Sequence, residues 1–312
     1  MKTPIFVIAG LFAAGAFAAD KTAVERVLSV EFTPTAAPRS EADRVRTYTT
    51  SSAVVTYAGG KRKAFPLSYH TLFRAGDRIG GGTAGLVVDR DGQPIMNSMP
   101  GAGGDSAQGP FHAYAPDANS LIRVGRGTHE KLFLVTHYEY HTEAPLVSGK
   151  GTLDLYAQLP AAMSLSGIRQ DRKTGKLAAG SIANIDMKDI GGLWIPCAGS
   201  LTPWNTHIGG EEYEPNARQF ETEPLDAMNL YLKTPGKRFD AGGANPYRYG
   251  HPVEVAVAAD GSTRVAKRYA MGRLSTELAD IMPDERTAYV GDDGRDTMMF
   301  MFIADRPRDL SA

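Results

Sequence analysis

The stretch from Gly191 to Pro215 gathers residue types that can do chemistry. It reads GGLWIPCAGSLTPWNTHIGGEEYEP and contains both tryptophans, the only cysteine of the chain (Cys197) and the glutamates Glu211, Glu212 and Glu214. A proline on either side of Cys197 stiffens the backbone, which helps a loop to hold a ligand at a fixed distance from a metal. Neighbouring carboxylates repel one another unless a cation or protons neutralise them. A thiolate with several oxygen ligands suits a transition metal next to a hard ion.

The same stretch also has a purely structural interpretation. The two tryptophans can pack in a hydrophobic core beside an exposed acidic hairpin. Cys197 can be a buried inert thiol, an intermolecular link or a metal ligand, because the chain has no second cysteine with which to pair it. The residues alone leave these alternatives open.

A second candidate is the segment VTHYEYHTE, residues 135–143. If it is a strand, His137, Glu139, His141 and Glu143 project from one face, because side chains alternate along a strand. Two imidazoles and two carboxylates on one strip can bind a metal. A solvated strand face explains the same spacing.

Two acidic turns follow near the end of the chain. GRLSTE (272–277) ends in Glu277, and YVGDDG (289–294) contains Asp292 and Asp293. Asp-Asp-Gly is an ordinary hairpin signal, so by itself this second turn indicates structure.

Several familiar motifs are excluded. GGGTAG (80–85) fits the dinucleotide pattern but leads into the apolar run LVVD, so no helix N-terminus is available for a pyrophosphate. DRDGQP (89–94) lacks the carboxylates of a calcium loop and indicates a hairpin turn. The sequence contains no G-x-S-x-G elbow and no H-E-x-x-H pair.

The N-terminus indicates export. Residues 1–19 combine a lysine, an apolar run and the small-x-small signal Ala16-Phe17-Ala18, which predicts a secretory signal peptide and a periplasmic or extracellular protein. The apolar run is shorter than the roughly 20 residues of a membrane span, so no stable membrane insertion is expected. The formal net charge is -1, which provides no basic field for nucleic acid.

The elements that must position these residues are mostly strands. Short β-type runs flank Gly-Gly, Asp-Gly and Asp-Gly-Ser, which is hairpin chemistry. Helices are expected only near residue 40, within 216–233 after Pro224, and from Ser275. Residues 97–110 predict a glycine-rich surface loop. With no exact internal repeat and no domain boundary, residues 20–312 predict one domain, a sandwich or a diverged propeller.

Taken in order, these pieces resemble the PhoX-type alkaline phosphatases, exported bacterial enzymes with a β-propeller fold and an iron–calcium cluster. The resemblance spans about residues 65 to 310, and its most specific element is Cys-Ala-Gly-Ser-x-Thr-Pro-Trp-Asn-Thr followed by Glu-Glu. It implies an all-β fold of the six-bladed propeller type, unclosed in this chain, with short helical insertions. Family members are considerably longer, so the chain is expected to be an N-terminal part.

The resemblance also implies a set of ligands. Cys197 matches the cysteine that ligates iron in the family. The implied ligands are Cys197, Glu139, Glu211, Glu212 and Glu277, with His137, Asp292 and Asp293 as further candidates. The chain departs from the family at His137, where the pattern has Asn, and at Thr276, where it has His.

The implied function is a secreted phosphomonoesterase that hydrolyses small-molecule phosphate esters at a cluster of iron and calcium. The alternative is a non-catalytic, calcium-binding propeller or an inactive truncated fragment that binds a ligand or partner protein. A calcium-dependent lactone hydrolase is a third reading, but its chemistry needs no thiolate.

Overall fold

The computed structural model describes residues 26–45, 51–96, 109–113, 115–139, 143–145, 152–154, 157–171 and 173–310. The predicted signal peptide, most of the 97–110 loop and His141 lie outside these residues. The chain divides into two compact units, residues 1–71 and 72–312. Among the described residues, no helix is both long and apolar enough to cross a bilayer.

The first unit contains a three-stranded antiparallel sheet in the order β1-β2-β3. Its elements are β1 (Val27–Phe32), α1 (Glu41–Arg44), β2 (Ser52–Tyr57) and β3 (Arg62–Pro66). The helix expected near residue 40 is thus confirmed as one short turn, which the Ser40 side chain caps by accepting from the Asp43 N–H. Gly59 and Gly60, both with positive φ, form the predicted β2–β3 hairpin turn.

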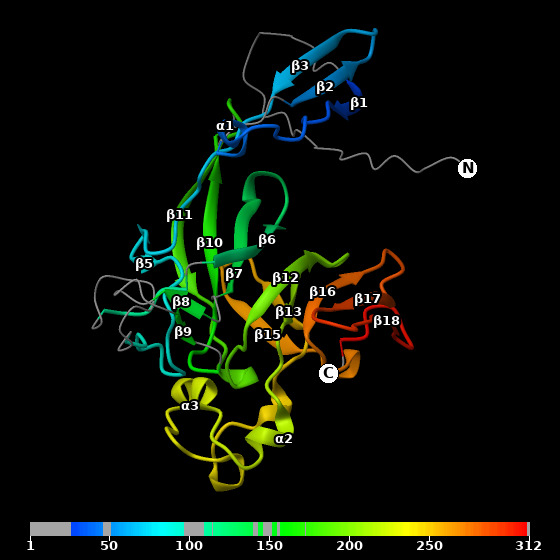
Figure 1. The fold of residues 1–312 in the computed structure, drawn as a ribbon. Coiled ribbons are helices and arrows are strands. Elements are labelled where there is room, and N and C mark those ends of the chain that lie inside the picture. The colour runs from blue at the N-terminus through cyan, green and yellow to red at the C-terminus, as the bar shows by residue number, and fades with distance from the viewer. Residues whose placement is uncertain are drawn as a thin grey trace. The chain divides into compact units, whose positions relative to one another are not determined.

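The second unit is built around three antiparallel sheets with the strand orders β11-β10-β7-β6, β12-β13-β14-β15 and β16-β17-β18, and Figure 1 labels all of these strands except β14. The strands of these sheets are β6 (Ala115–Val124), β7 (Lys131–Glu139), β10 (Ala162–Gln170), β11 (Leu177–Asn184), β12 (Pro196–Leu201), β13 (His207–Glu211), β14 (Val253–Val257), β15 (Thr263–Lys267), β16 (Thr276–Ile281), β17 (Thr287–Asp292) and β18 (Met299–Ile303). The small strands are β4 (Arg78–Ile79), β5 (Gly82–Thr83), β8 (Glu143–Pro145) and β9 (Thr152–Asp154).

In each of the three sheets, the strands follow one another in chain order from one edge strand to the other. The first strands of the sheets are β6, β12 and β16, and β12 contacts both β6 and β16. The mostly β architecture is therefore confirmed. Within the described residues the sheets do not close into a ring, and the six-bladed propeller stays a prediction.

Helices are few and short, as the sequence predicts. α3 (Asp226–Leu232) falls in the region expected after Pro224, whereas α2 (Ala217–Phe220) forms before Pro224, where no helix was expected, and the Asn216 side chain caps its N-terminus. The 3₁₀ turns are η1 (Gly127–His129), η2 (Lys188–Ile190), η3 (Phe239–Ala241), η4 (Pro246–Arg248) and η5 (Tyr269–Met271). The helix expected from Ser275 is wrong, because Thr276–Ile281 forms β16. Pairing with β17 and burial of Ala279 override the local helical spacing there.

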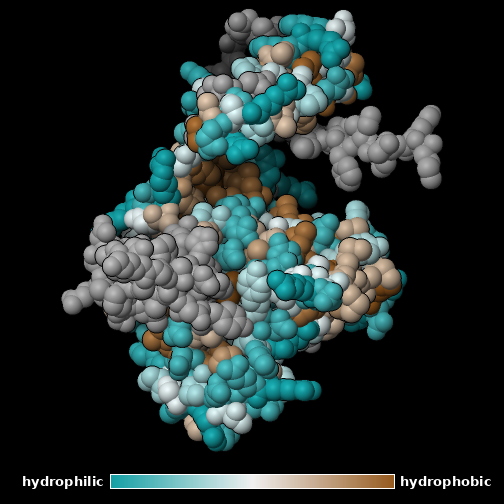
Figure 2. Space-filling view, in the orientation of Figure 1, coloured by the Kyte–Doolittle hydropathy of each residue, from teal (hydrophilic) through white to brown (hydrophobic). Residues whose placement is uncertain are grey.

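The main hydrophobic core includes residues of the β6–β11 sheet, of β14 and of α3. Trp194, Leu193 and Ile195 are fully buried in it, together with Tyr249 and Met228. Trp194 thus takes the core position that the structural interpretation allowed. The surface in Figure 2 is mixed, and apolar side chains gather over the β16–β18 sheet, where Met299 and Met301 are exposed.

Candidate metal centre

Two groups of possible metal ligands share Cys197. One group is Asp117, Glu139 and Cys197, and the other is Cys197, Glu212 and Glu277. Within each group, the potential ligand atoms all lie within 4.8 Å of one another. The structure therefore brings together four residues predicted from the sequence and adds Asp117, which the sequence reasoning missed.

Three of these residues occupy the same place in three different sheets. These residues are Asp117 on β6, Cys197 on β12 and Glu277 on β16. Each directly follows a paired residue and is the first residue of a β-bulge. Across the bulge the first strand of the sheet advances by three residues, while the second strand advances by two. The flanking pairs are Pro116 with Tyr138 and Asn119 with Thr136, Pro196 with Glu211 and Gly199 with Gly209, and Thr276 with Asp292 and Ala279 with Val290. A bulge of this kind bends a strand and re-aims a side chain. Each sheet therefore presents one ligand candidate at its bulge.

An acid occupies an equivalent position at the end of the second strand of each sheet or directly after it. Glu139, Glu212 and Asp293 each come directly after the residue that is paired just before the bulge. Glu139 and Glu212 are in the groups around Cys197, and Asp293 contacts Glu212 closely enough to shift its pKa. The same arrangement therefore occurs three times in the candidate centre: one residue at the bulge of the first strand and one acid at the end of the second or directly after it. We call it the repeated bulge arrangement.

Glycines allow the strands to approach one another here. A Cβ on Gly210 would collide with the carbonyl oxygen of Thr276, the residue before Glu277. Any side chain at this position would push β13 away from β16. Gly210 therefore allows Glu212 to approach Glu277.

The electrostatics match a site built for cations. Burial raises the pKa of the Cys197 thiol, and the Asp117 and Glu277 carboxylates raise it further. Burial and the Asp293 carboxylate raise the pKa of Glu212 to about 8, while the contact with Glu212 lowers the pKa of Asp293. Without a metal, protons must therefore neutralise part of the centre.

Glu139 follows the same logic. Its pKa is raised by burial first and then by Asp117, Glu277 and Asp293. Among the described residues, no Lys or Arg forms an ion pair with any acid of the centre. The buried Oε2 of Glu212 also has no hydrogen-bond partner there. Unpaired acids with an unused buried oxygen fit a bound cation.

His137 lies behind the centre and meets a second histidine. The rings of His137 and His207 are fully buried, with centroids 5.0 Å apart and an interplanar angle of 78°. Burial lowers the pKa of His137 well below its usual range, the neighbouring His207 lowers it further, and the Cys197 backbone acts in the opposite direction. Burial also lowers the pKa of His207 to about 4. Both rings are therefore neutral at physiological pH.

Glu211 and Asp292 are placed outside the ligand groups. The Glu211 carboxylate forms an ion pair with Lys267, and Asp292 Oδ1 accepts a hydrogen bond from the Ser275 N–H at 3.1 Å. Tyr138, at the equivalent position of the first sheet, bonds through its hydroxyl to Ser164 Oγ at 2.9 Å. In all three sheets, the residue just before the acid (Tyr138, Glu211 or Asp292) thus binds another protein group through its side chain.

Comparison with known families gives a match that lies in the C-terminal part of the chain. Residues 158–311 match the family model described as alkaline phosphatase PhoX. This segment, called the PhoX segment below, is similar to the PhoX family. No curated protein and no solved structure matches the chain.

The PhoX segment contains Cys197, Glu212, Glu277 and Asp293, which are the ligand candidates of two of the three sheets. The remaining sheet supplies Asp117 and Glu139 from outside the segment. The structure thus extends the PhoX portion of the centre with two acids that the family match does not reach.

A sequence signal for Asp117 does exist. Residues 116–120 read PDANS and residues 196–200 read PCAGS, so Pro-x-Ala-x-Ser occurs once in β6 and once in β12. Both serines serve the packing of these strands: Ser120 Oγ bonds with His207 Nδ1 at 2.8 Å, and Ser200 Oγ donates to the Ala279 carbonyl at 2.7 Å. The short repeat marks the equivalent ligand positions.

Proposed function

We propose that the protein is an exported, metal-dependent phosphomonoesterase of the PhoX type, with iron and calcium at the centre around Cys197. One observation carries this proposal: Cys197 is shared by two groups of acids, and within the described part of the chain no Lys or Arg pairs with these acids. A thiolate ligand suits iron, and the oxygen-rich remainder suits calcium. The PhoX match supports phosphate esters as the substrate class.

The residues that would hold the metals are those of the repeated bulge arrangement. Cys197, Glu212 and Glu277 form one side and Asp117 and Glu139 the other, with Asp293 beside Glu212. Bound cations would supply the positive charge that stabilises the phosphoryl oxygens during transfer to water. The formal net charge of -1 provides no long-range attraction for a phosphate ester, so its binding depends on this local charge.

The chain's own contribution is to orient the ligands and to release protons from them. The Cys197 sulfur and the Glu212 carboxyl both carry protons near neutral pH when no metal is bound, because their pKa values are raised. Metal binding must displace these protons. Strand pairing on either side of each bulge then fixes the backbone from which each ligand projects.

We also propose that residues 1–19 direct export, which places the mature protein in the periplasm or outside the cell. An oxidising compartment usually pairs cysteines, whereas Cys197 is free. A metal ligand role accounts for an unpaired thiol in that setting.

The experiment is metal analysis combined with an activity assay on the full chain. Protein reconstituted with iron and calcium is expected to contain both metals and to release phosphate from a chromogenic phosphomonoester. Cys197→Ser should lose iron and activity together. Glu214→Gln is a matched control, because Glu214 is near in sequence but lies in neither ligand group.

Bound iron with no hydrolysis of the ester would contradict the proposed reaction. Calcium without iron, and with unchanged metal content in Cys197→Ser, would instead support a non-catalytic calcium-binding module.

A further inference from the structure

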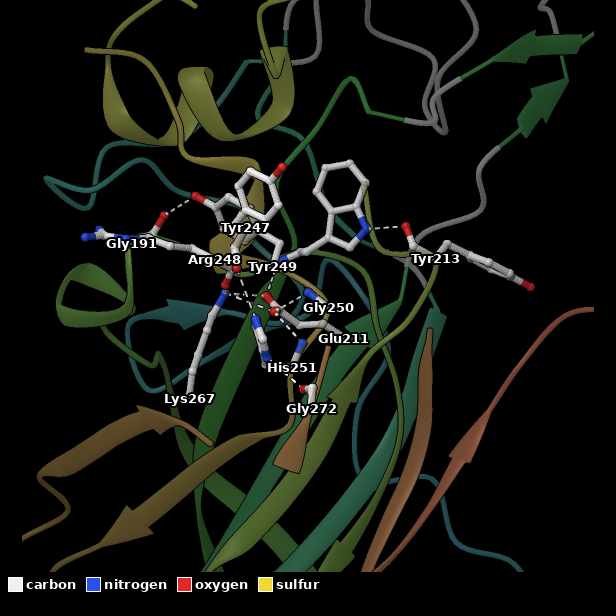
Figure 3. A network of polar contacts seen from close by, with 11 residues as sticks. Gly191, Glu211, Tyr213, Tyr247, Arg248, Tyr249, Gly250, His251, Lys267 and Gly272 are labelled. Carbon is white, nitrogen blue, oxygen red and sulfur yellow. Dashed lines mark hydrogen bonds and ion pairs between the residues drawn. The ribbon is translucent and has the colours of Figure 1, made fainter. Parts of the chain in front are cut away.

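Glu211 forms a fully buried ion pair next to the candidate metal centre. Its carboxylate and the Lys267 ammonium both have no solvent exposure, and Lys267 Nζ lies 2.8 Å from Oε1 and 2.9 Å from Oε2 (Figure 3). The partners come from the end of β13 and the end of β15. Glu211 directly precedes the ligand candidate Glu212.

The Glu211 carboxylate also binds three backbone N–H groups from two other segments. Oε1 accepts from Trp194 at 2.8 Å, and Oε2 accepts from Gly250 at 3.0 Å and from His251 at 3.3 Å. Trp194 is three residues before Cys197. The carboxylate therefore ties the segment that leads to Cys197 to the segment that leads into β14.

Lys267 is equally well satisfied. Its third contact is the Arg248 carbonyl oxygen at 2.7 Å, and its ammonium lies 4.2 Å from the centroid of the Tyr249 ring. Tyr249 in turn donates to the Gly191 carbonyl at 2.8 Å, as Figure 3 shows. The pair thus joins β13, β15 and the segments around residues 191–194 and 248–251 into one network.

This network is placed where it can set the positions of two ligands. Glu211 pairs across the sheet with Pro196, the residue before Cys197, and the Glu212 N–H donates to the Ile195 carbonyl at 2.7 Å. A shift of the Glu211 carboxylate would therefore move both the Cys197 side and the Glu212 side of the bulge.

Stability alone does not account for a buried ion pair at this place. Removing two charges from water is costly, and replacing such a pair with apolar residues is often neutral or stabilising. Here the hydrogen bonds that the two residues do not make to each other all go to backbone groups, three of them to Glu211 and one from Lys267. The other two sheets also anchor the equivalent residue, through Tyr138 with Ser164 and through Asp292 with the Ser275 N–H.

We propose that the Glu211–Lys267 ion pair is the positioning device of the candidate metal centre, which holds Cys197 and Glu212 at ligand distance from each other. The inference rests on the proposed function for its purpose, but its geometry can be tested without metal. Neither residue is itself a ligand in this assignment.

The test uses Cys197 as a probe, since it is the only cysteine in the chain. The rate of its alkylation by iodoacetamide is measured against pH in the metal-free full chain, for the wild type, Glu211→Gln, Lys267→Met and the double variant. The packing of Cys197 among the acids in the wild type should keep the reaction slow. If the ion pair holds this packing, the thiol should be more accessible in each variant, and each should react about tenfold faster at the same pH.

Glu254→Gln is the matched control. Glu254 is also a buried carboxylate, lies in the neighbouring strand β14 and pairs with Arg268, but its other contacts go to the Trp204 and Thr206 side chains. Its alkylation profile should stay within about twofold of the wild type. A purely structural role of Glu211 would affect the two glutamate variants alike.

Alkylation profiles that match the wild type in the double variant, or that rise equally in Glu254→Gln, would overturn the proposal. The double variant leaves no unpaired buried charge, so it decides the matter if a single variant fails to fold. Iron and calcium content of the same proteins is the second readout and should fall in the ion-pair variants. A wild type that takes up no metal would contradict the proposed function, whereas the alkylation profiles would still decide the positioning role.

Discussion

Glu211 and Glu212 are neighbours in the chain, but their carboxyl groups lie in different surroundings. Glu211 binds Lys267 and three backbone N–H groups, whereas Glu212 lies with Cys197 and Glu277. One is neutralised by a protein cation, and the other has a pKa raised to about 8. Two identical neighbours thus differ in environment: Glu211 is neutralised by Lys267, and Glu212 is among the candidate metal ligands.

The first prediction concerns the stability of the ion pair. Lys267→Met should lower the free energy of unfolding by about 3–5 kcal/mol, because it leaves the Glu211 charge buried without its partner. Adding Glu211→Gln should recover part of this loss. Urea unfolding monitored by circular dichroism measures both. Asp91→Asn is the control, since the exposed Asp91–Lys233 pair should contribute no more than about 1 kcal/mol.

A double variant that is as unstable as the sum of its single variants would contradict this account. It would mean that the two charges do not compensate each other in the folded protein.

The second prediction concerns the acids contributed by the first sheet. Asp117→Asn and Glu139→Gln should each reduce the metal bound per chain, because both residues are in one ligand group with Cys197. Elemental analysis of reconstituted protein measures this. Glu130→Gln, in the connection between β6 and β7, should keep the wild-type content, since Glu130 pairs with Arg123 at the surface. Full metal content in both acid variants would limit the centre to the PhoX segment.

The sequence predicted which residues gather at the candidate centre better than how they are arranged. Cys197, Glu139, Glu212 and Glu277 could be found because thiols and clustered acids are visible as residue types. The division between Glu211 and Glu212 could not, since it depends on Lys267, a residue 56 positions away that strand pairing brings in.

Asp117 and β16 could not be predicted from the local sequence. Asp117 becomes a ligand candidate only through a bulge on β6, and a bulge is a property of strand register. The run from Ser275 has helix-compatible spacing, but pairing with β17 makes it a strand. The hairpins at Gly59-Gly60 and Gly261 were predictable because their turn residues need positive φ.

The third prediction is a pH dependence of the metal-free protein. Because the pKa of Glu212 is raised from 4.5 to about 8, the folded state binds more protons than the unfolded state between these values. The free energy of unfolding should therefore fall as the pH rises from about 7 to about 8.5. The lowered pKa values of His137 and His207 act in the opposite direction only below about pH 6.5, outside this window.

Urea unfolding in the presence of a chelator at several pH values measures this slope. Glu212→Gln should flatten it, because the amide does not titrate. Added metal should reverse it, since cations replace the protons. An unchanged slope in Glu212→Gln would assign the effect to other groups.

The fourth prediction concerns the packing of the buried histidine behind the centre. A Cβ on Gly209 would lie 2.7 Å from both Cε1 and Nδ1 of His137 and 3.2 Å from Nε2 of His207. Gly209→Ala should therefore cost about 1–3 kcal/mol of unfolding free energy through overpacking. In a His137→Ala background the closest atoms are gone, so the added methyl group should cost much less. The double-mutant cycle should give a coupling energy of about 1 kcal/mol or more.

Gly291→Ala provides the control for this cycle, because its Cβ would meet Glu277 Cβ at 3.9 Å, an ordinary contact. It should change the unfolding free energy by less than about 0.5 kcal/mol, with or without His137. Additive effects of Gly209→Ala and His137→Ala would show that the glycine does not make room for this ring. A coupling confined to Gly209 would show that β13 carries a glycine there because the histidine of β7 packs against its backbone.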